Sequence, residues 1–183
     1  MSRLRPPQAL AAALALTGAA AIAATAPPAL ASSTGHGPTA AQIRAAVRRA
    51  ERSRDLWATV NICRRQDNKD VIGIRGQMPS LGFTTEMSIT VRVEFWSRDS
   101  ARFLPVPRIA KPVALGTATH TVVQGGASFR FHPPAGLLRG AVTFVWKLGD
   151  KVLAKTTRKT SHGHKHVDYA DPPGYSAGTC TLG

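Results

Sequence analysis

Apolar and polar residues alternate along much of the chain beyond residue 56, which is the period of half-buried β-strands. The clearest run is 87–96, where alternate side chains should lie on opposite faces of one strand. The set expected to face a core is Met87, Ile89, Val91, Val93 and Phe95, and the set expected to face water is Ser88, Thr90, Arg92, Glu94 and Trp96. On this pattern Glu94 is predicted to be an exposed same-face neighbour of Arg92.

Further strands are indicated by apolar runs that lie between clusters of turn residues. The expected segments are 56–63, 71–77, 118–123 and 127–132. The stretch that begins at Arg102 is less regular, because Pro105, Pro107 and Pro112 restrict parts of it to edge strand or loop. The pair Gly125-Gly126 predicts a turn before the last of these segments.

The strongest local signal is a β-hairpin. Two apolar runs, 140–148 and 151–157, flank the two-residue turn Gly149-Asp150. Val142, Phe144 and Trp146 share one face of the first run and are core candidates. With the other segments this makes about seven or eight strands and almost no internal helix, which predicts an antiparallel immunoglobulin-like β-sandwich.

One helix is predicted before the strands. Thr39 and Gln42 form a capping-box pattern, and residues 40–53 contain good helix formers without Pro or Gly. A small apolar stripe is formed by Ile43, Val47 and Ala50, while four arginines lie elsewhere on the helix: Arg44, Arg48, Arg49 and Arg52. Two interpretations remain open, a helix that lies on an anionic membrane or polymer and a solvated connector that packs a few alanines on the domain.

The N-terminus has the pattern of a secretory signal peptide. Arg3 and Arg5 precede an apolar, alanine-rich run, and Ala29-Leu30-Ala31 forms a cleavage site before Ser32. A membrane anchor is the competing interpretation, but Thr17-Gly18 and Pro27-Pro28 interrupt the run. We therefore expect a secreted, extracellular protein. Its expected parts are a signal peptide at 1–31, a flexible leader with the short basic helix at 32–55, and a β-sandwich domain at 56–183.

The charge balance is strongly basic. The chain has 24 basic and 10 acidic residues, a net charge of +14, and removing the two arginines of the signal leaves +12. In an exported protein this favours polyanionic partners such as envelope polymers, phospholipid headgroups or extracellular nucleic acid, although charge also serves solubility alone. Specific recognition of nucleic acid is not predicted, because the aromatic residues Trp57, Trp96 and Tyr169 are dispersed along the chain.

The two cysteines, Cys63 and Cys180, are expected to form a disulfide, since export places them in an oxidising compartment. The bond would join the first core strand to the C-terminus. In antibody domains the bridged cysteines lie on inner strands, so the topology is expected to differ there. A redox-active pair would need a short C-x-x-C spacing, which these residues lack.

Residues 174–178 (GYSAG) match the G-x-S-x-G pattern of serine hydrolases. That motif needs a strand before the serine and a helix after it, with an acid and a histidine later in the chain. The five residues after Gly178 contain no Asp, Glu or His. We therefore interpret the match as chance, and Ser176 is not predicted to be a nucleophile.

Three histidines alternate in His162-Gly163-His164-Lys165-His166. In an extended segment they would share one side, where they would suit Zn²⁺ or Cu²⁺. Asp168 and Asp171 would then assist as oxygen ligands or acceptors. The alternatives are a solvated loop and a cationic patch that responds to pH.

Three segments resemble uncharacterised secreted proteins of high-GC Gram-positive bacteria. They are TVNIC at 59–63, IGIRGQMP at 72–79, and the tail that begins with DPPGYS at 171–176 and runs to Cys180. The resemblance covers roughly residues 56–182. It implies an exported β-rich domain and assigns no functional residue.

The sequence thus predicts a secreted, disulfide-stabilised β-sandwich that acts by binding, without catalysis and without a cofactor. The expected partners are anionic cell-envelope polymers or a phospholipid surface, bound through the four helix arginines. The alternative is an extracellular metal-binding protein that uses His162, His164 and His166.

Overall fold

The structure is a computed structural model that describes residues 37–65, 68–132 and 135–183. The predicted signal peptide and most of the leader lie outside these residues. Among the described residues, no helix has the length and apolar character needed to cross a membrane.

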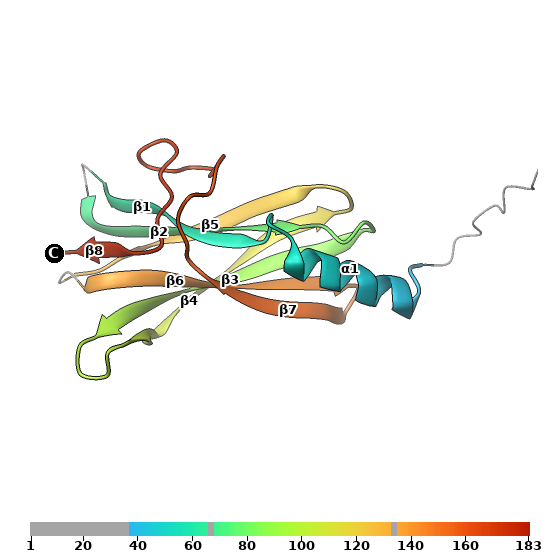
Figure 1. Cartoon of the computed structure of the whole chain (residues 1–183), viewed down its shortest axis with the longest axis horizontal. Coiled ribbons are helices and arrows are strands. Elements are labelled where there is room, and N and C mark those ends of the chain that lie inside the picture. Colours follow the sequence, from blue (N-terminus) through green and yellow to red (C-terminus); the bar gives the residue numbers. More distant parts are fainter. Residues whose placement is uncertain (1–36, 66–67, 133–134) are drawn as a thin grey trace, which may run out of the picture. The chain divides into compact units, whose positions relative to one another are not determined.

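Two antiparallel sheets face each other in a β-sandwich (Figure 1). The first sheet has the order β1-β2-β5, formed by Trp57–Arg65, Asn68–Pro79 and Val122–Arg130. The second has the order β4-β3-β6-β7, formed by Arg102–Ala118, Thr85–Ser97, Gly136–Leu148 and Lys151–Lys159. A last short strand, β8 (Cys180–Leu182), pairs with the start of β6. The predicted fold class, an antiparallel all-β sandwich with a short N-terminal helix, is confirmed. β4 pairs with β3, whereas the fourth strand of a constant-type immunoglobulin domain pairs with the fifth.

The core lies between the sheets and contains the predicted apolar stripes. Met87, Ile89, Val91 and Val93 of β3 are buried, and so are Val142, Phe144 and Trp146 of β6. The Trp146 indole Nε1 donates to the backbone oxygen of Pro79 at 2.9 Å. The predicted hairpin is also confirmed, because β6 and β7 pair antiparallel with Gly149 and Asp150 at the turn between them.

The helix α1 (Ala40–Arg52) begins and ends close to its predicted bounds. The Thr39 hydroxyl accepts from the Gln42 amide at 3.3 Å, and the Gln42 side chain accepts from the Thr39 amide at 2.7 Å, which is the predicted capping box. Ala46 and Ala50 are buried against the sandwich. Arg158 of β7 donates to the backbone oxygen of Glu51 at 2.6 Å, so the end of α1 is attached to that strand.

The connection between β7 and β8, residues 160–179, lies along β1 (Figure 1). Backbone bridges join Val60 to Ala177 and Ile62 to Asp171. This connection is the reason why every residue of β1 from Trp57 to Ile62 is buried, although neighbouring side chains point to opposite faces. The same connection ends at the Cys63–Cys180 disulfide, whose Cα atoms are 5.6 Å apart. The predicted disulfide is confirmed, and it joins edge positions of the two sheets in place of inner strands.

Two sequence predictions near β5 are wrong. Residues 119–121 form the bend between β4 and β5, where a strand over 118–123 was expected, and the predicted turn at Gly125-Gly126 lies inside β5. The glycines are needed for close packing, because a Cβ on Gly125 would overlap the Leu115 side chain and one on Gly126 would overlap the backbone oxygen of Ile74. The proline-containing segment is a continuous edge strand, one of the two forms expected.

The prediction for Glu94 is also wrong, because this residue is only 8% exposed. Its carboxylate accepts from Arg139 Nε at 2.7 Å and from Lys159 Nζ. The β3–β6 pairing is regular here, with Glu94 opposite Arg139, so alternation along β3 holds and Glu94 is buried among its partners on the face that it shares with Arg92. Burial alone would raise the pKa of Glu94, but the hydrogen bonds and charges of Lys159 and Arg139 outweigh it and lower the pKa.

Candidate functional site

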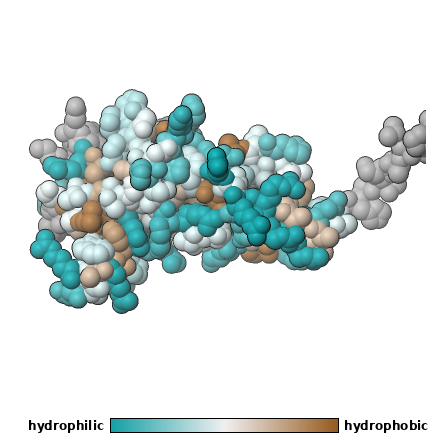
Figure 2. Space-filling model, viewed as in Figure 1, coloured by the Kyte–Doolittle hydropathy of each residue, from teal (hydrophilic) through white to brown (hydrophobic). Residues whose placement is uncertain are grey.

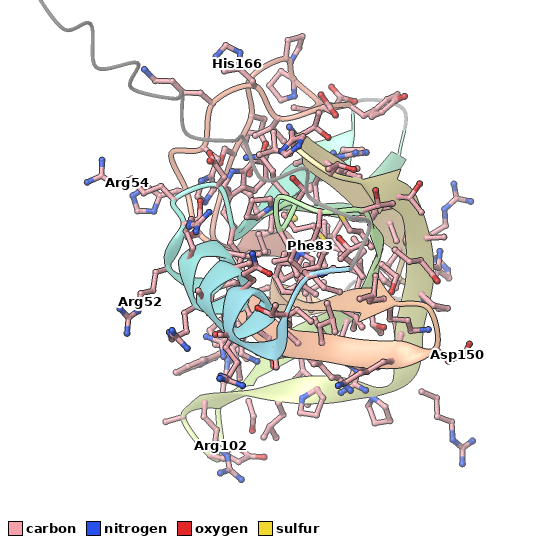
Figure 3. The ribbon with its side chains drawn as sticks, turned by 90° about the vertical axis from the view of Figure 1, so that its right-hand side faces the viewer. Arg52, Arg54, Phe83, Arg102, Asp150 and His166 are labelled. Carbon is pink, nitrogen blue, oxygen red and sulfur yellow. A yellow bond between two sulfur atoms is a disulfide. The ribbon has the colours of Figure 1, made fainter. Side chains whose placement is uncertain are left out.

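The four predicted helix arginines form one exposed basic surface, called here the α1 arginine surface, and it consists of Arg44, Arg48, Arg49 and Arg52. The helix presents them because its alanine stripe, which includes Ala46 and Ala50, faces the sandwich. Figure 3 shows Arg52 and the nearby Arg54 pointing away from the ribbon. Within α1 these four arginines stand against one acidic residue, Glu51 in the last turn.

Two neighbouring cavities lie between α1 and the turns at the same end of the sandwich. One has a volume of about 510 Å³ and the other about 230 Å³, and Arg49 lines both. The larger cavity is also lined by Ala45, Leu81 and Phe83, and the smaller one by Ser80 and His120. Phe83 is labelled near the middle of the view in Figure 3, above and to the right of α1. The α1 arginine surface therefore borders a partly apolar hollow.

The sequence did not indicate Leu81, Phe83 or His120 as neighbours of the helix. They come from the β2–β3 and β4–β5 turns, which are distant from α1 in the chain. A local pattern signals the arginines, whereas only the fold of the whole sandwich brings the turns beside them.

The structure does not bring the three predicted metal-ligand histidines together. His164 is half-buried, with its ring stacked on Trp57 at a centroid distance of 4.6 Å, while His162 and His166 are exposed. His166 lies at the outer end of the loop in Figure 3. The segment is not extended, because Gly163 and His166 have φ angles of 83° and 54°. No group of three His, Cys, Asp or Glu side chains placed to hold a metal occurs in the described part of the chain.

His164 instead forms part of a hydrogen-bonded contact between the C-terminal connection and β1. Its Nε2 lies 2.8 Å from the Ser161 hydroxyl, and its backbone amide donates to the Ser176 hydroxyl at 3.0 Å. Burial first, and the charge of His162 second, lower the pKa of His164.

Ser176, the serine of the G-x-S-x-G match, lies in this same contact. Its hydroxyl is 2.8 Å from the hydroxyl of Thr59 in β1. Ser176 is in the irregular connection before β8, so the strand and helix that flank a hydrolase nucleophile are both lacking around it within the described residues. Its hydrogen bonds hold the connection on β1.

The chain was compared with known protein families and with curated proteins. Neither the models of protein families nor the curated proteins give a match to this chain.

Proposed function

We propose that this protein is a secreted binding module whose α1 arginine surface attaches it to anionic polymers of the cell envelope. The observation that carries the proposal is the arrangement of α1, which packs its alanines on the sandwich and leaves four arginines in water. The two interpretations of the helix are then compatible. One face packs alanines on the domain, and the opposite face is available to contact an anionic surface.

The spacing of the arginines supports joint action on a polymer. Arg44, Arg48 and Arg52 follow one another at four-residue intervals, so they lie on one side of the helix at about 6 Å per step. That distance is below the Debye length of about 8 Å at physiological salt, so the charges act together on a nearby chain of anions. The face in Figure 2 shows hydrophilic residues and residues of intermediate hydropathy, with small separate hydrophobic patches.

Export is part of the same proposal. The signal-peptide pattern supports it, and a disulfide between Cys63 and Cys180 is the bond expected in an oxidising compartment.

The test is retention on immobilised polyphosphate over a series of salt concentrations. The wild-type protein is expected to elute at high salt, and replacing Arg44, Arg48, Arg49 and Arg52 with Gln is expected to lower the eluting salt concentration markedly. Gln is a good helix former, so the helix should remain. Vesicles that contain phosphatidylglycerol, tested in parallel, show whether lipid headgroups serve as well as the polymer.

The matched control removes the same charge elsewhere, in the variant with Gln at Arg98, Arg102, Lys151 and Lys165, all of them exposed. If both quadruple variants lose retention equally, binding depends only on net charge and the proposal is wrong. Unchanged retention of the α1 variant at low salt would also overturn it.

A further inference from the structure

The edge strand β4 leaves its regular pairing with β3 over one short stretch. Arg92 of β3 pairs with Ala110, and two residues later Glu94 pairs with Pro105, so residues 106–109 bulge from the ladder. Bulges at sheet edges re-aim side chains and are frequent beside functional sites.

Arg108, at the centre of this bulge, has a left-handed backbone with φ 59°. This conformation is unfavourable for an arginine by about 1–2 kcal/mol, whereas Gly or Asn adopts it more readily. Because its backbone is left-handed, Arg108 directs its side chain differently from a residue in a regular strand.

Cavities lie on both sides of Arg108. One, of about 320 Å³, is bordered by Arg92 and the bulge residues, and the other, of about 270 Å³, is bordered by Lys111, Phe129 and Arg130. Arg108 lines both, and among the residues that the structure describes no acidic one lines either cavity. Three positively charged side chains from β4 and β5 therefore border the second cavity.

Lys111 is held in place at this cavity. Its Nζ donates to the backbone oxygen of Ser128 at 2.7 Å and lies 4.9 Å from the centre of the Phe129 ring. An ammonium group has three donors, so this one keeps donors for a ligand. Glu94, the acid that follows Arg92 on β3 by two residues, is already bonded to Arg139 and Lys159.

We propose that the β4 bulge binds a phosphate group, with Arg108 and Lys111 as its principal ligands and Arg130 at the rim. The planar guanidinium of Arg108 donates two parallel hydrogen bonds to a phosphate, and the ammonium of Lys111 supplies a point charge beside it. This site is separate from the α1 arginine surface and does not depend on the function proposed for it.

The phosphate is either free or part of a phosphodiester polymer, and two probes distinguish these sources. Inorganic phosphate and poly(glycerol phosphate) are titrated separately into the isotopically labelled exported protein, and the amide NMR shifts are followed. Saturable shifts centred on Arg108, Ile109 and Lys111 are expected with at least one probe. A response to inorganic phosphate shows a site for the free ion, and a response to the polymer alone shows a site for a phosphodiester.

The decisive variant is Arg108→Asn, because Asn removes the guanidinium and tolerates the left-handed backbone. We expect this variant to bind phosphate roughly tenfold more weakly, because it loses a charge-assisted pair of hydrogen bonds at a partly exposed site. Arg108→Lys keeps the charge but not the paired donors, so its binding should be intermediate. Arg102→Gln, an exposed charge at the start of the same strand, is the control and should bind like wild type.

The absence of saturable shifts with both probes would overturn the inference, and so would either of two further results. One is a set of shifts spread over all basic residues with no saturation, which indicates screening of charge alone. The other is equal affinity of the wild type and Arg108→Asn, provided that the variant has the native spectrum elsewhere. The quadruple α1 variant is expected to keep this binding, so failure at one site leaves the other hypothesis standing.

Discussion

At the scale of the residue, Glu94 connects three strands of the second sheet. It lies on β3 and accepts from Arg139 of β6 and Lys159 of β7. Its side chain is 10% exposed and that of Arg139 is 28% exposed, so solvent screens the pair less than an ordinary surface bridge. Removing the carboxylate would leave Arg139 partly buried without its partner.

Glu94→Gln is therefore expected to lower the free energy of unfolding by about 1–3 kcal/mol at neutral pH. The folded state lowers the pKa of Glu94, so its ionised form stabilises the fold fully above the ordinary glutamate range, and this contribution is lost as the pH falls through the lowered value. Urea unfolding from neutral to acidic pH measures both effects, and the variant should lose less stability in acid than wild type. The exposed Glu86→Gln is the control, and a matching loss in it would contradict this role for Glu94.

Glycine shows why sequence patterns fail at single residues. Gly149 was predicted correctly as a turn, since strand patterns flank it, but Gly125 and Gly126 have the same local signal and lie within β5. Glycine is required at these two positions because the Leu115 side chain and the Ile74 backbone, which belong to other strands, approach too closely for a Cβ. Such contacts are not encoded in the residues next to a glycine.

At the scale of the element, sequence prediction succeeded where the signal is local. The capping box and the run of good helix formers predict α1, and two alternating runs with a two-residue turn predict the β6–β7 hairpin. The bounds of β4 were not predictable in the same way, because its three prolines are tolerated only by its position at a sheet edge. That position depends on the whole strand order.

The capping box gives a prediction for α1 by itself. Thr39→Ala removes the hydroxyl that accepts from the Gln42 amide, so we expect the first turn to fray and the helix to lose about 1 kcal/mol. Amide hydrogen exchange should accelerate in α1 while exchange in β3 and β6 stays unchanged. Thr117→Ala, at an exposed site on β4, should leave α1 as in wild type. Unchanged exchange in α1 of the Thr39 variant would show that packing on the sandwich alone maintains the helix.

At the scale of the whole molecule, the two proposed binding sites differ in how far the sequence indicates them. The α1 arginines lie within nine residues of one another, so their pattern is visible in the chain. Lys111 and Arg130 reach the β4 bulge site from different strands of different sheets, and the bulge itself has no clear sequence signal. The histidines show the opposite error, because alternation in sequence suggested a convergence that the turns of the loop prevent.

The disulfide acts on the whole molecule, because it ties β1 of one sheet to β8 of the other across 117 residues. In the chain-entropy model, closing a loop of this size stabilises the folded state by about 4–5 kcal/mol. Replacing both Cys63 and Cys180 with Ser should therefore lower the free energy of unfolding by an amount of that order. The loss of hydrogen-exchange protection should be greatest for residues 160–182, since β8 is only three residues long.

Urea unfolding and hydrogen exchange measure these effects, and chemically reduced wild type should behave like the double variant. Asn61 and Thr59 of β1 still donate to backbone oxygens of Tyr169 and Ser161, at 2.9 and 2.8 Å, so the connection keeps contacts with β1 when the covalent bond is absent. If the double variant unfolds with the free energy of oxidised wild type, those hydrogen bonds and β8 pairing hold the C-terminus without the disulfide. If instead only the C-terminal amides lose protection from exchange while the core stays intact, the disulfide stabilises the connection at 160–179 on β1 and not the β-sandwich itself.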